Sequence, residues 1–122
     1  MATQRKSNRG GLHLRIRVVG TAGDALGPGK AQLLEAVART GSLRQAAAEL
    51  EMSYMKAWRL ANAMNVNFRS PLLETSRGGN LRGGTQLTAL GQKALAAYHR
   101  MTARATEAAQ KEWKALAVLL KK

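Results

Sequence analysis

The stretch from Ser42 to Asn62 constrains the fold more than any other part of the sequence, because its pattern is that of two short helices joined by a tight turn. Ser42 can cap the first helix, and Gln45, three residues later, completes a capping box. Glu51-Met52 forms the turn, and Ser53 caps the second helix. This pattern predicts a helix–turn–helix, a motif whose second helix can lie in the major groove of DNA.

The inward faces of the two helices are apolar, with Ala46, Ala47 and Leu50 on the first helix and Ala57, Leu60, Ala61 and Met64 on the second. The small residues Ala46 and Ala47 let the two helices cross closely. Many such turns have glycine where Glu51 stands, because the backbone there favours a left-handed conformation that costs other residues about 1 kcal/mol. Because two capped helices with a small-residue crossing are common, an ordinary helical hairpin with a solvated face is the alternative interpretation.

The outer face of the second helix carries long polar side chains that can reach base edges and phosphates in a major groove. We assign base reading to Ser53, Tyr54, Lys56, Arg59 and Asn62. Met55 is a candidate for contact with a thymine methyl group, although an exposed methionine is also a common bystander. Trp58 has two interpretations, packing beneath a following hairpin or stacking on a sugar. Arg44, on the first helix, is a candidate for phosphate contact.

The charge balance favours a polyanionic partner. The 122 residues contain 20 lysines and arginines against seven acidic residues, a formal charge of +13. We expect this partner to be double-stranded DNA rather than an anionic membrane. No segment approaches the run of about 18 apolar residues that spans a bilayer, and no apolar core of a signal peptide follows the basic N-terminus. The chain has no cysteine, and we expect a cytoplasmic protein without a membrane partner.

The N-terminal part precedes the helices with a different pattern. Residues 1–11 form a predicted disordered basic arm, which either lies along phosphates or is a solvated tail. Leu12 to Val19 alternates apolar and polar residues, which predicts a half-buried strand that must pair with a later one. Residues 20–24 are a predicted loop.

The sequence Gly27-Pro28-Gly29-Lys30 resembles part of a phosphate-binding loop, but the match fails. Asp24 stands where the motif needs its first glycine, and Ala31 stands where it needs serine or threonine. Instead, Pro28 is typical of the first turn of a helix, which we expect to end at Gly41.

Two short extended pieces, Leu72 to Ser76 and Thr85 to Leu87, flank a glycine-rich segment that permits a hairpin. A hairpin directly after a recognition helix is a wing. Arg77 and Arg82, near its tip, are candidates for phosphate or minor-groove contact. The alternative is a solvent-exposed loop whose two arginines have no role in DNA binding. The strand at Leu12 to Val19 is a candidate third member of this sheet.

Thr88 can cap a long helix that we expect to run to about Leu120, a span of about 50 Å. Its apolar stripe comprises Leu90, Ala94, Ala97, Met101, Ala105 and Ala108. An exposed stripe of this length predicts pairing with a second copy of the chain. The alternative is packing on the chain's own domain after a break.

Several short motifs resemble the N-terminal DNA-binding domain of ModE, the molybdate-responsive transcriptional regulator, and more broadly are similar to the LysR-type winged helix. They are Leu33-Leu34-Glu35-Ala36-Val37, Thr40-Gly41-Ser42, Gln45-Ala46-Ala47, Met52-Ser53-Tyr54, Lys56-Ala57-Trp58, Ala63-Met64-Asn65, and Leu87-Thr88 with Gly91. The resemblance covers roughly residues 12–101. It implies a winged helix–turn–helix whose second helix, beginning at Ser53, reads a palindromic operator, with a dimer held by the first and last helices.

The resemblance has one large departure. ModE proteins continue into molybdate-binding β-barrel modules, whereas this chain stops soon after the long helix. We therefore do not expect molybdate to bind this chain directly. The resemblance implies DNA binding without implying molybdate sensing.

Catalysis is not expected. His13 and His99 are the only histidines, and no set of nucleophile, base and orienting residue is visible. We expect no metal and no cofactor. The predicted fold is mainly α with a small β wing: an arm at 1–11, a winged helix–turn–helix at 12–87 and a dimerisation helix at 88–122.

The predicted function is a DNA-binding transcriptional regulator acting as a homodimer. Two alternatives are a sequence-indifferent architectural nucleic-acid-binding protein, which the charge would serve equally well, and a protein-interaction module using the long helix.

Overall fold

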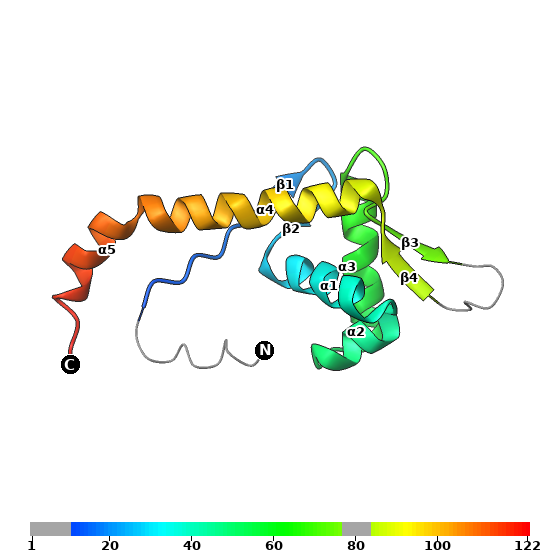
Figure 1. Ribbon diagram of the computed structural model, residues 1–122, viewed down its shortest axis with the longest axis horizontal. Helices are drawn as coiled ribbons and strands as arrows, with labels where there is room; N and C mark the ends of the chain where they lie inside the picture. The colour runs from blue at the N-terminus through cyan, green and yellow to red at the C-terminus, as the bar shows by residue number, and fades with distance from the viewer. Residues whose placement is uncertain (1–10, 77–83) are drawn as a thin grey trace.

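The computed structural model describes residues 11–76 and 84–122. In chain order its elements are β1 (Val18–Gly20), β2 (Gly23–Leu26), α1 (Pro28–Thr40), α2 (Leu43–Glu49), α3 (Tyr54–Asn67), β3 (Leu73–Ser76), β4 (Gly84–Leu87), α4 (Ala89–Ala108) and α5 (Gln110–Ala117). Figure 1 shows α1, α2 and α3 gathered at one end of α4, with β3 and β4 projecting beside them and α5 at the opposite end. The expected architecture, mainly α-helical with a small β wing after a helix–turn–helix, is confirmed.

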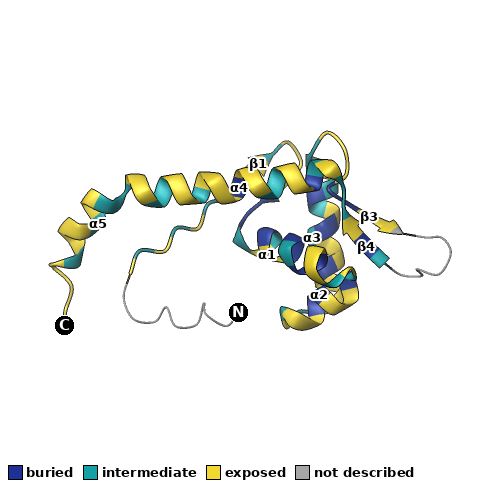
Figure 2. Cartoon of the chain, viewed as in Figure 1, coloured by how far each residue is buried: buried dark blue, intermediate teal, exposed yellow. Residues whose placement is uncertain are grey.

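The core lies where α1, α2 and α3 meet. Leu33, Leu34 and Val37 of α1 pack there with Ala46 of α2 and Met64 of α3, all of them almost fully buried. Figure 2 shows buried residues on the inward sides of these helices and exposed residues on their outer sides. The small residues at the crossing of α2 and α3 therefore have the role expected from the sequence.

The local start and stop signals of these helices act as predicted. Pro28 opens α1, and Gly41 ends it with φ 72°. The hydroxyl of Ser42 accepts a hydrogen bond from the Gln45 amide at 3.1 Å, and Glu51 adopts φ 57° in the turn. The reciprocal half of the capping box differs from the prediction. The Ser42 amide donates to the Thr40 hydroxyl at 3.3 Å, so Thr40 takes the place expected for the Gln45 side chain.

The N-terminal strand is shorter than predicted and pairs differently. Residues 11–17 alternate in exposure as expected, but the ladder begins only at Val18. Strand β1 pairs antiparallel with β2 across a tight turn, so Gly23 and Asp24 belong to a strand rather than to the predicted loop. Glycine at 23 permits its φ of 113°, and the Asn67 side chain accepts a hydrogen bond from the Ala22 amide at 2.8 Å. The two hairpins form separate sheets, so β1 does not join the wing.

Helix α4 lies very close to the start of the wing at Gly91. A Cβ atom at this position would lie 2.2 Å from the carbonyl oxygen of Leu72, so only glycine fits. The Thr88 hydroxyl fixes the same junction, because it donates to the Pro71 carbonyl at 2.7 Å and accepts from the Gly91 amide at 2.9 Å. Further along α4, the buried Tyr98 hydroxyl donates to the Ile16 carbonyl at 2.7 Å.

The prediction of one continuous helix from Thr88 to about Leu120 is wrong, because the helix is interrupted at Ala109. The side-chain amide of Gln110 donates to the Thr106 carbonyl at 2.9 Å. In a continuous helix that carbonyl would accept from the Gln110 backbone N–H. Thr106 also bonds back to the Thr102 carbonyl, a pattern that bends helices. Figure 1 shows α5 turning away from the axis of α4.

Within residues 11–76 and 84–122, no helix combines the length and the apolar character needed to cross a bilayer.

Candidate nucleic-acid interface

Helix α3 presents one side to the core and the opposite side to solvent. Ala57, Ala61 and Met64 are buried. Because successive helical residues are rotated by about 100°, Met55 and Arg59 lie on the opposite side. The structure therefore separates a core face from an outer face, as the sequence pattern predicts.

The described candidate residues are all exposed: Arg44, Ser53, Tyr54, Met55, Lys56, Arg59 and Asn62. They lie on α3, on its N-cap and in the first turn of α2. Ser53 also has a structural role, since its hydroxyl accepts a hydrogen bond from the Lys56 amide at 3.0 Å. The structure thus brings seven of the nine candidates to one part of the surface.

The remaining two candidates, Arg77 and Arg82, lie outside the described residues. The strands that lead to them are described, and they confirm a hairpin after α3. Leu73 pairs with Leu87 and Ser76 pairs with Gly84 in an antiparallel register. The Thr85 amide donates to the Gly41 carbonyl at 3.0 Å, which ties this wing to the junction of α1 and α2.

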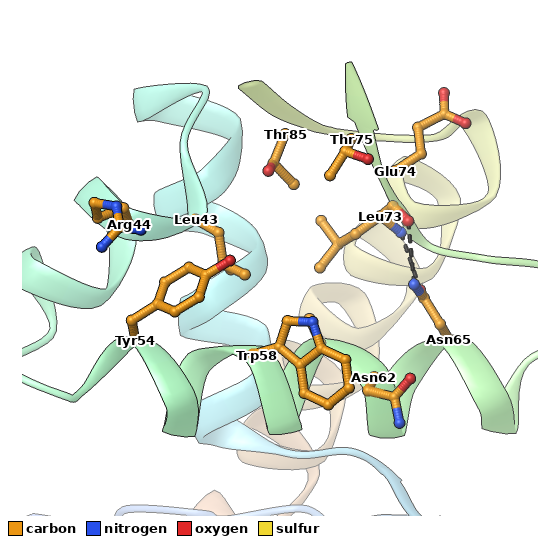
Figure 3. Close-up of a pocket in the computed structure, with 11 residues that line it drawn as sticks. Leu43, Arg44, Tyr54, Trp58, Asn62, Asn65, Leu73, Glu74, Thr75 and Thr85 are labelled. Atoms are coloured by element: carbon orange, nitrogen blue, oxygen red, sulfur yellow. Dashed lines mark hydrogen bonds between the residues drawn. The ribbon is translucent and has the colours of Figure 1, made fainter. Parts of the chain in front are cut away.

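An open groove of about 300 Å³, which we call the wing-side cleft, lies between α3 and strands β3 and β4. Figure 3 shows its lining from α2, α3 and the wing. Its polar and aromatic residues are Arg44, Tyr54, Trp58, Asn62, Asn65, Glu74, Thr75 and Thr85. Trp58 lines this cleft, so its side chain faces the wing. Trp58 is 47% exposed and therefore remains accessible from solvent.

Asn65 fixes the wing to α3 through three hydrogen bonds. Its side-chain oxygen accepts from the amides of Leu72 and Leu73 at 2.8 and 3.1 Å, and its side-chain nitrogen donates to the Leu73 carbonyl at 3.1 Å. Asn65 is a functional position that the sequence pattern of α3 does not single out. A signal was available, since an amide residue in a half-buried helical position needs partners, and the chain reverses at Pro71 shortly afterwards.

The ion pairs of the described residues lie elsewhere. They join Arg17 to Asp24 at 3.3 Å, Arg39 to Glu49, and His99 to Glu35 at 2.6 Å. None of the seven candidates within the described residues takes part in these pairs, so Arg44, Lys56 and Arg59 keep their charge available for a polyanion.

Among the described residues, the one resolved pKa shift lies away from the interface, on α4. Burial raises the pKa of Tyr98 above its usual 10.0, opposed by the positive charge of Arg15, but Tyr98 lies on α4. In residues 11–76 and 84–122, no cluster of three or more histidine, cysteine or acidic side chains could hold a metal ion.

Comparison with protein families gives a match over residues 29–92, just over half of the chain, to the bacterial regulatory helix-turn-helix proteins of the lysR family. This segment contains α1 except for its first residue, α2, α3, both wing strands and the start of α4.

The chain is also similar to two curated proteins. It is 37% identical over 97 residues to the molybdenum-pterin-binding protein MopB of Rhodobacter capsulatus. These aligned residues make up 80% of this chain and 36% of MopB. It is 39% identical over 71 residues to the transcriptional regulator ModE of Haemophilus influenzae, which covers 58% of this chain and 28% of ModE. The chain thus spans about a third of the length of these relatives. The resemblance to the ModE-type DNA-binding domain is confirmed.

Among solved structures, the DNA-binding domain of CbnR, crystallised in complex with DNA, is 28% identical with a TM-score of 0.56. The match covers 71% of this chain and 94% of that domain.

Proposed function

Because the chain belongs to the lysR family of bacterial regulatory helix-turn-helix proteins, we propose that it binds a palindromic operator as a homodimer and regulates transcription from it. The coarser assignment, a DNA-binding regulator of ModE/LysR type, is supported by the family match, by the similarity to the regulator ModE and by the likeness to the DNA-bound CbnR domain. The observation that carries the proposal is the outer face of α3, which is exposed, polar and bordered by the wing-side cleft. The cytoplasm is the compartment that this role requires.

In this proposal α3 enters the major groove, which at about 12 Å wide accepts an α-helix with its side chains. Ser53, Tyr54, Lys56, Arg59 and Asn62 read base edges, and Met55 contacts a thymine methyl group. Arg44 holds a phosphate from the edge of the wing-side cleft, and Arg77 and Arg82 contact the backbone or minor groove from the wing.

The dimer is formed by the C-terminal helices. Tyr98 is the last residue of α4 that is buried against its own domain, and Figure 2 shows exposed residues along most of the helix beyond it. Large exposed apolar side chains continue in this region: Met101, Leu116, Val118, Leu119 and Leu120. Burying them against a second copy removes apolar surface from water. A two-fold axis through this contact presents two α3 helices to two half-sites.

An architectural nucleic-acid-binding role is the second candidate, and the net charge of +13 favours it. Such a protein binds every duplex with similar affinity through phosphate contacts. It has no need for a helix with a polar face that is capped by Ser53 and fixed to the wing by Asn65. Neither role includes catalysis, and we assign no molybdate site to residues 11–76 and 84–122.

Selection of bound sites from a pool of random duplexes tests the proposal. The expected result is one enriched motif with two-fold symmetry and half-sites about 10 base pairs apart, or a multiple of this spacing. Binding without an enriched motif would support the architectural role. Failure to bind any duplex at low salt would contradict both roles and support a protein-interaction module. The Leu119→Asp variant should lose the symmetric motif while the molecular mass in solution falls to that of one chain.

A further inference from the structure

A second groove lies on the other flank of α3, away from the wing. We call it the hairpin-side cleft, with a volume of about 350 Å³. Lys56 and Leu60 of α3 line one wall, and the other wall comes from β2, the residues before β1 and the start of α1. Tyr54 and Trp58 line the wing-side cleft instead. The exposed Met55 and Arg59 therefore lie between two grooves that run along opposite flanks of the same helix.

The hairpin-side cleft is strongly basic. Arg15, Arg17, Lys30 and Lys56 line it from three separate parts of the chain, against one acidic residue, Asp24. The carboxylate of Asp24 pairs with Arg17 at 3.3 Å. Three positive charges thus remain without a counter-charge among the described ion pairs of this groove. Side chains so distant in sequence meet here because β2 packs along α3.

The start of α1 adds hydrogen-bond donors to the same groove. Gly27 is the N-cap of α1, and no side chain caps this end. The first intrahelical bond runs from the Ala31 amide to the Gly27 carbonyl at 2.8 Å. The amides of Gly29 and Lys30 come before this bond, so they have no carbonyl partner within the helix. A Cβ atom at Gly29 would have no neighbour within 4 Å, which shows that the backbone is open there. The segment Gly27-Pro28-Gly29-Lys30, which is not a phosphate-binding loop, is therefore the N-terminus of a helix that borders a basic groove.

A helix in the major groove has one sugar–phosphate strand on each side. The two clefts along the flanks of α3 would then face opposite strands of one duplex. We propose that the hairpin-side cleft binds backbone phosphates of the DNA strand opposite to the one held from the wing side, through Arg15 and Lys30, while Lys56 at its edge points to the bases. This inference rests on the proposed function and adds a contact surface built from the segment before α1.

The test uses the full chain and a duplex carrying the selected motif. The variant combines Arg15→Gln with Lys30→Gln, and the control combines Arg100→Gln with Lys93→Gln, which removes the same two charge types from exposed positions on α4. For each protein, log affinity is measured against log salt concentration. The cleft variant should lose about 2 from the magnitude of the slope, because each phosphate contact contributes about 0.9. The control should keep the wild-type slope.

Ethylation interference identifies the strand. In wild type, ethylation of certain phosphates on both strands should block binding. With the cleft variant, ethylation should no longer block binding at phosphates of one strand. With Arg44→Gln, the phosphates that lose their effect should lie on the other strand. An unchanged slope, a loss equal to that of the control, or identical interference patterns would overturn the inference while leaving specific DNA binding intact. If the wild-type chain binds no duplex, the proposed function fails as well. If the double variant unfolds, Arg15→Gln alone should lose about 1 from the slope, and an unchanged slope overturns the inference.

Discussion

The guanidinium group of Arg44 lies over the ring of Tyr54, with its central carbon 4.6 Å from the ring centroid. Arg44 is in the first turn of α2, and Tyr54 is the first residue of α3. The contact therefore bridges the two helices of the motif at its solvent-facing edge. An exposed cation–π pair contributes about 0.5–1 kcal/mol, and here it holds both groups at the mouth of the wing-side cleft.

This placement predicts a phosphate contact rather than base reading for Arg44. The Arg44→Ala variant should weaken binding to the selected motif and to random DNA by the same factor, and should lower the salt slope by about 1. Arg44→Lys should retain most of the slope because it keeps the charge. Fluorescence titrations at several salt concentrations measure both quantities. A loss confined to the selected motif would instead place Arg44 among the base-reading residues.

Asn65 should matter for stability although it lies beside the interface. The Asn65→Ala variant leaves the amides of Leu72 and Leu73 and the carbonyl of Leu73 without their partner. We expect the free energy of unfolding to fall by about 2–3 kcal/mol, measured by urea denaturation. Asn62→Ala makes the same chemical change at an exposed position of α3 and should stay within about 0.5 kcal/mol of wild type. Equal effects of the two variants would mean that Asn65 does not hold the wing.

Gly91 should tolerate no side chain. In Gly91→Ala the new methyl group would meet the Leu72 carbonyl oxygen at 2.2 Å, so α4 must move away from the start of the wing. We expect a destabilisation of about 1–3 kcal/mol, as for other overpacked sites, visible as a lower thermal midpoint. Gly29→Ala is the control, because its methyl group has open space in a helix and should stabilise by up to about 1 kcal/mol. A neutral Gly91→Ala would show that α4 docks differently.

Tyr98 should make stability fall at high pH. Burial raises its pKa above 10.0 in the folded chain, so its contribution is complete below the unfolded pKa and is lost as the pH rises through the folded pKa. Tyr98→Phe should cost about 1 kcal/mol at pH 7, through loss of the hydrogen bond to Ile16, and should decline less steeply above pH 10. Urea denaturation of both proteins between pH 7 and 11 isolates this group from the lysines. Parallel curves would contradict the assignment.

The parts of the fold that follow from local chemistry could be predicted from the sequence. Ser42, Ser53 and Thr88 all cap helices through a hydroxyl, as expected from their place before apolar periodic segments. The outer face of α3 follows from the helical period alone. These features need only the neighbouring residues, which the sequence displays directly.

The parts that depend on contacts between distant segments could not be predicted. The β1–β2 turn is held by Asn67, which is 45 positions away from Ala22. The interruption at Ala109 involves only neighbouring residues, yet it could not be predicted either, because the helical pattern of the sequence does not indicate that the Gln110 side chain donates to the Thr106 carbonyl. At the interface, both clefts arise from packing between segments far apart in the sequence, so the periodicity of α3 indicates which residues are exposed but not what borders them.

The most direct test of the account measures the affinity ratio between the selected motif and a scrambled duplex for the Arg59→Ala variant. Arg59 lies at the centre of the exposed face of α3, between the two clefts. The ratio should fall by about tenfold or more, the loss expected when one base contact is removed, whereas the exposed Arg69→Ala control should leave it unchanged. A variant that weakens both duplexes equally, and so retains the wild-type ratio, would contradict the claim that this face of α3 reads the DNA sequence.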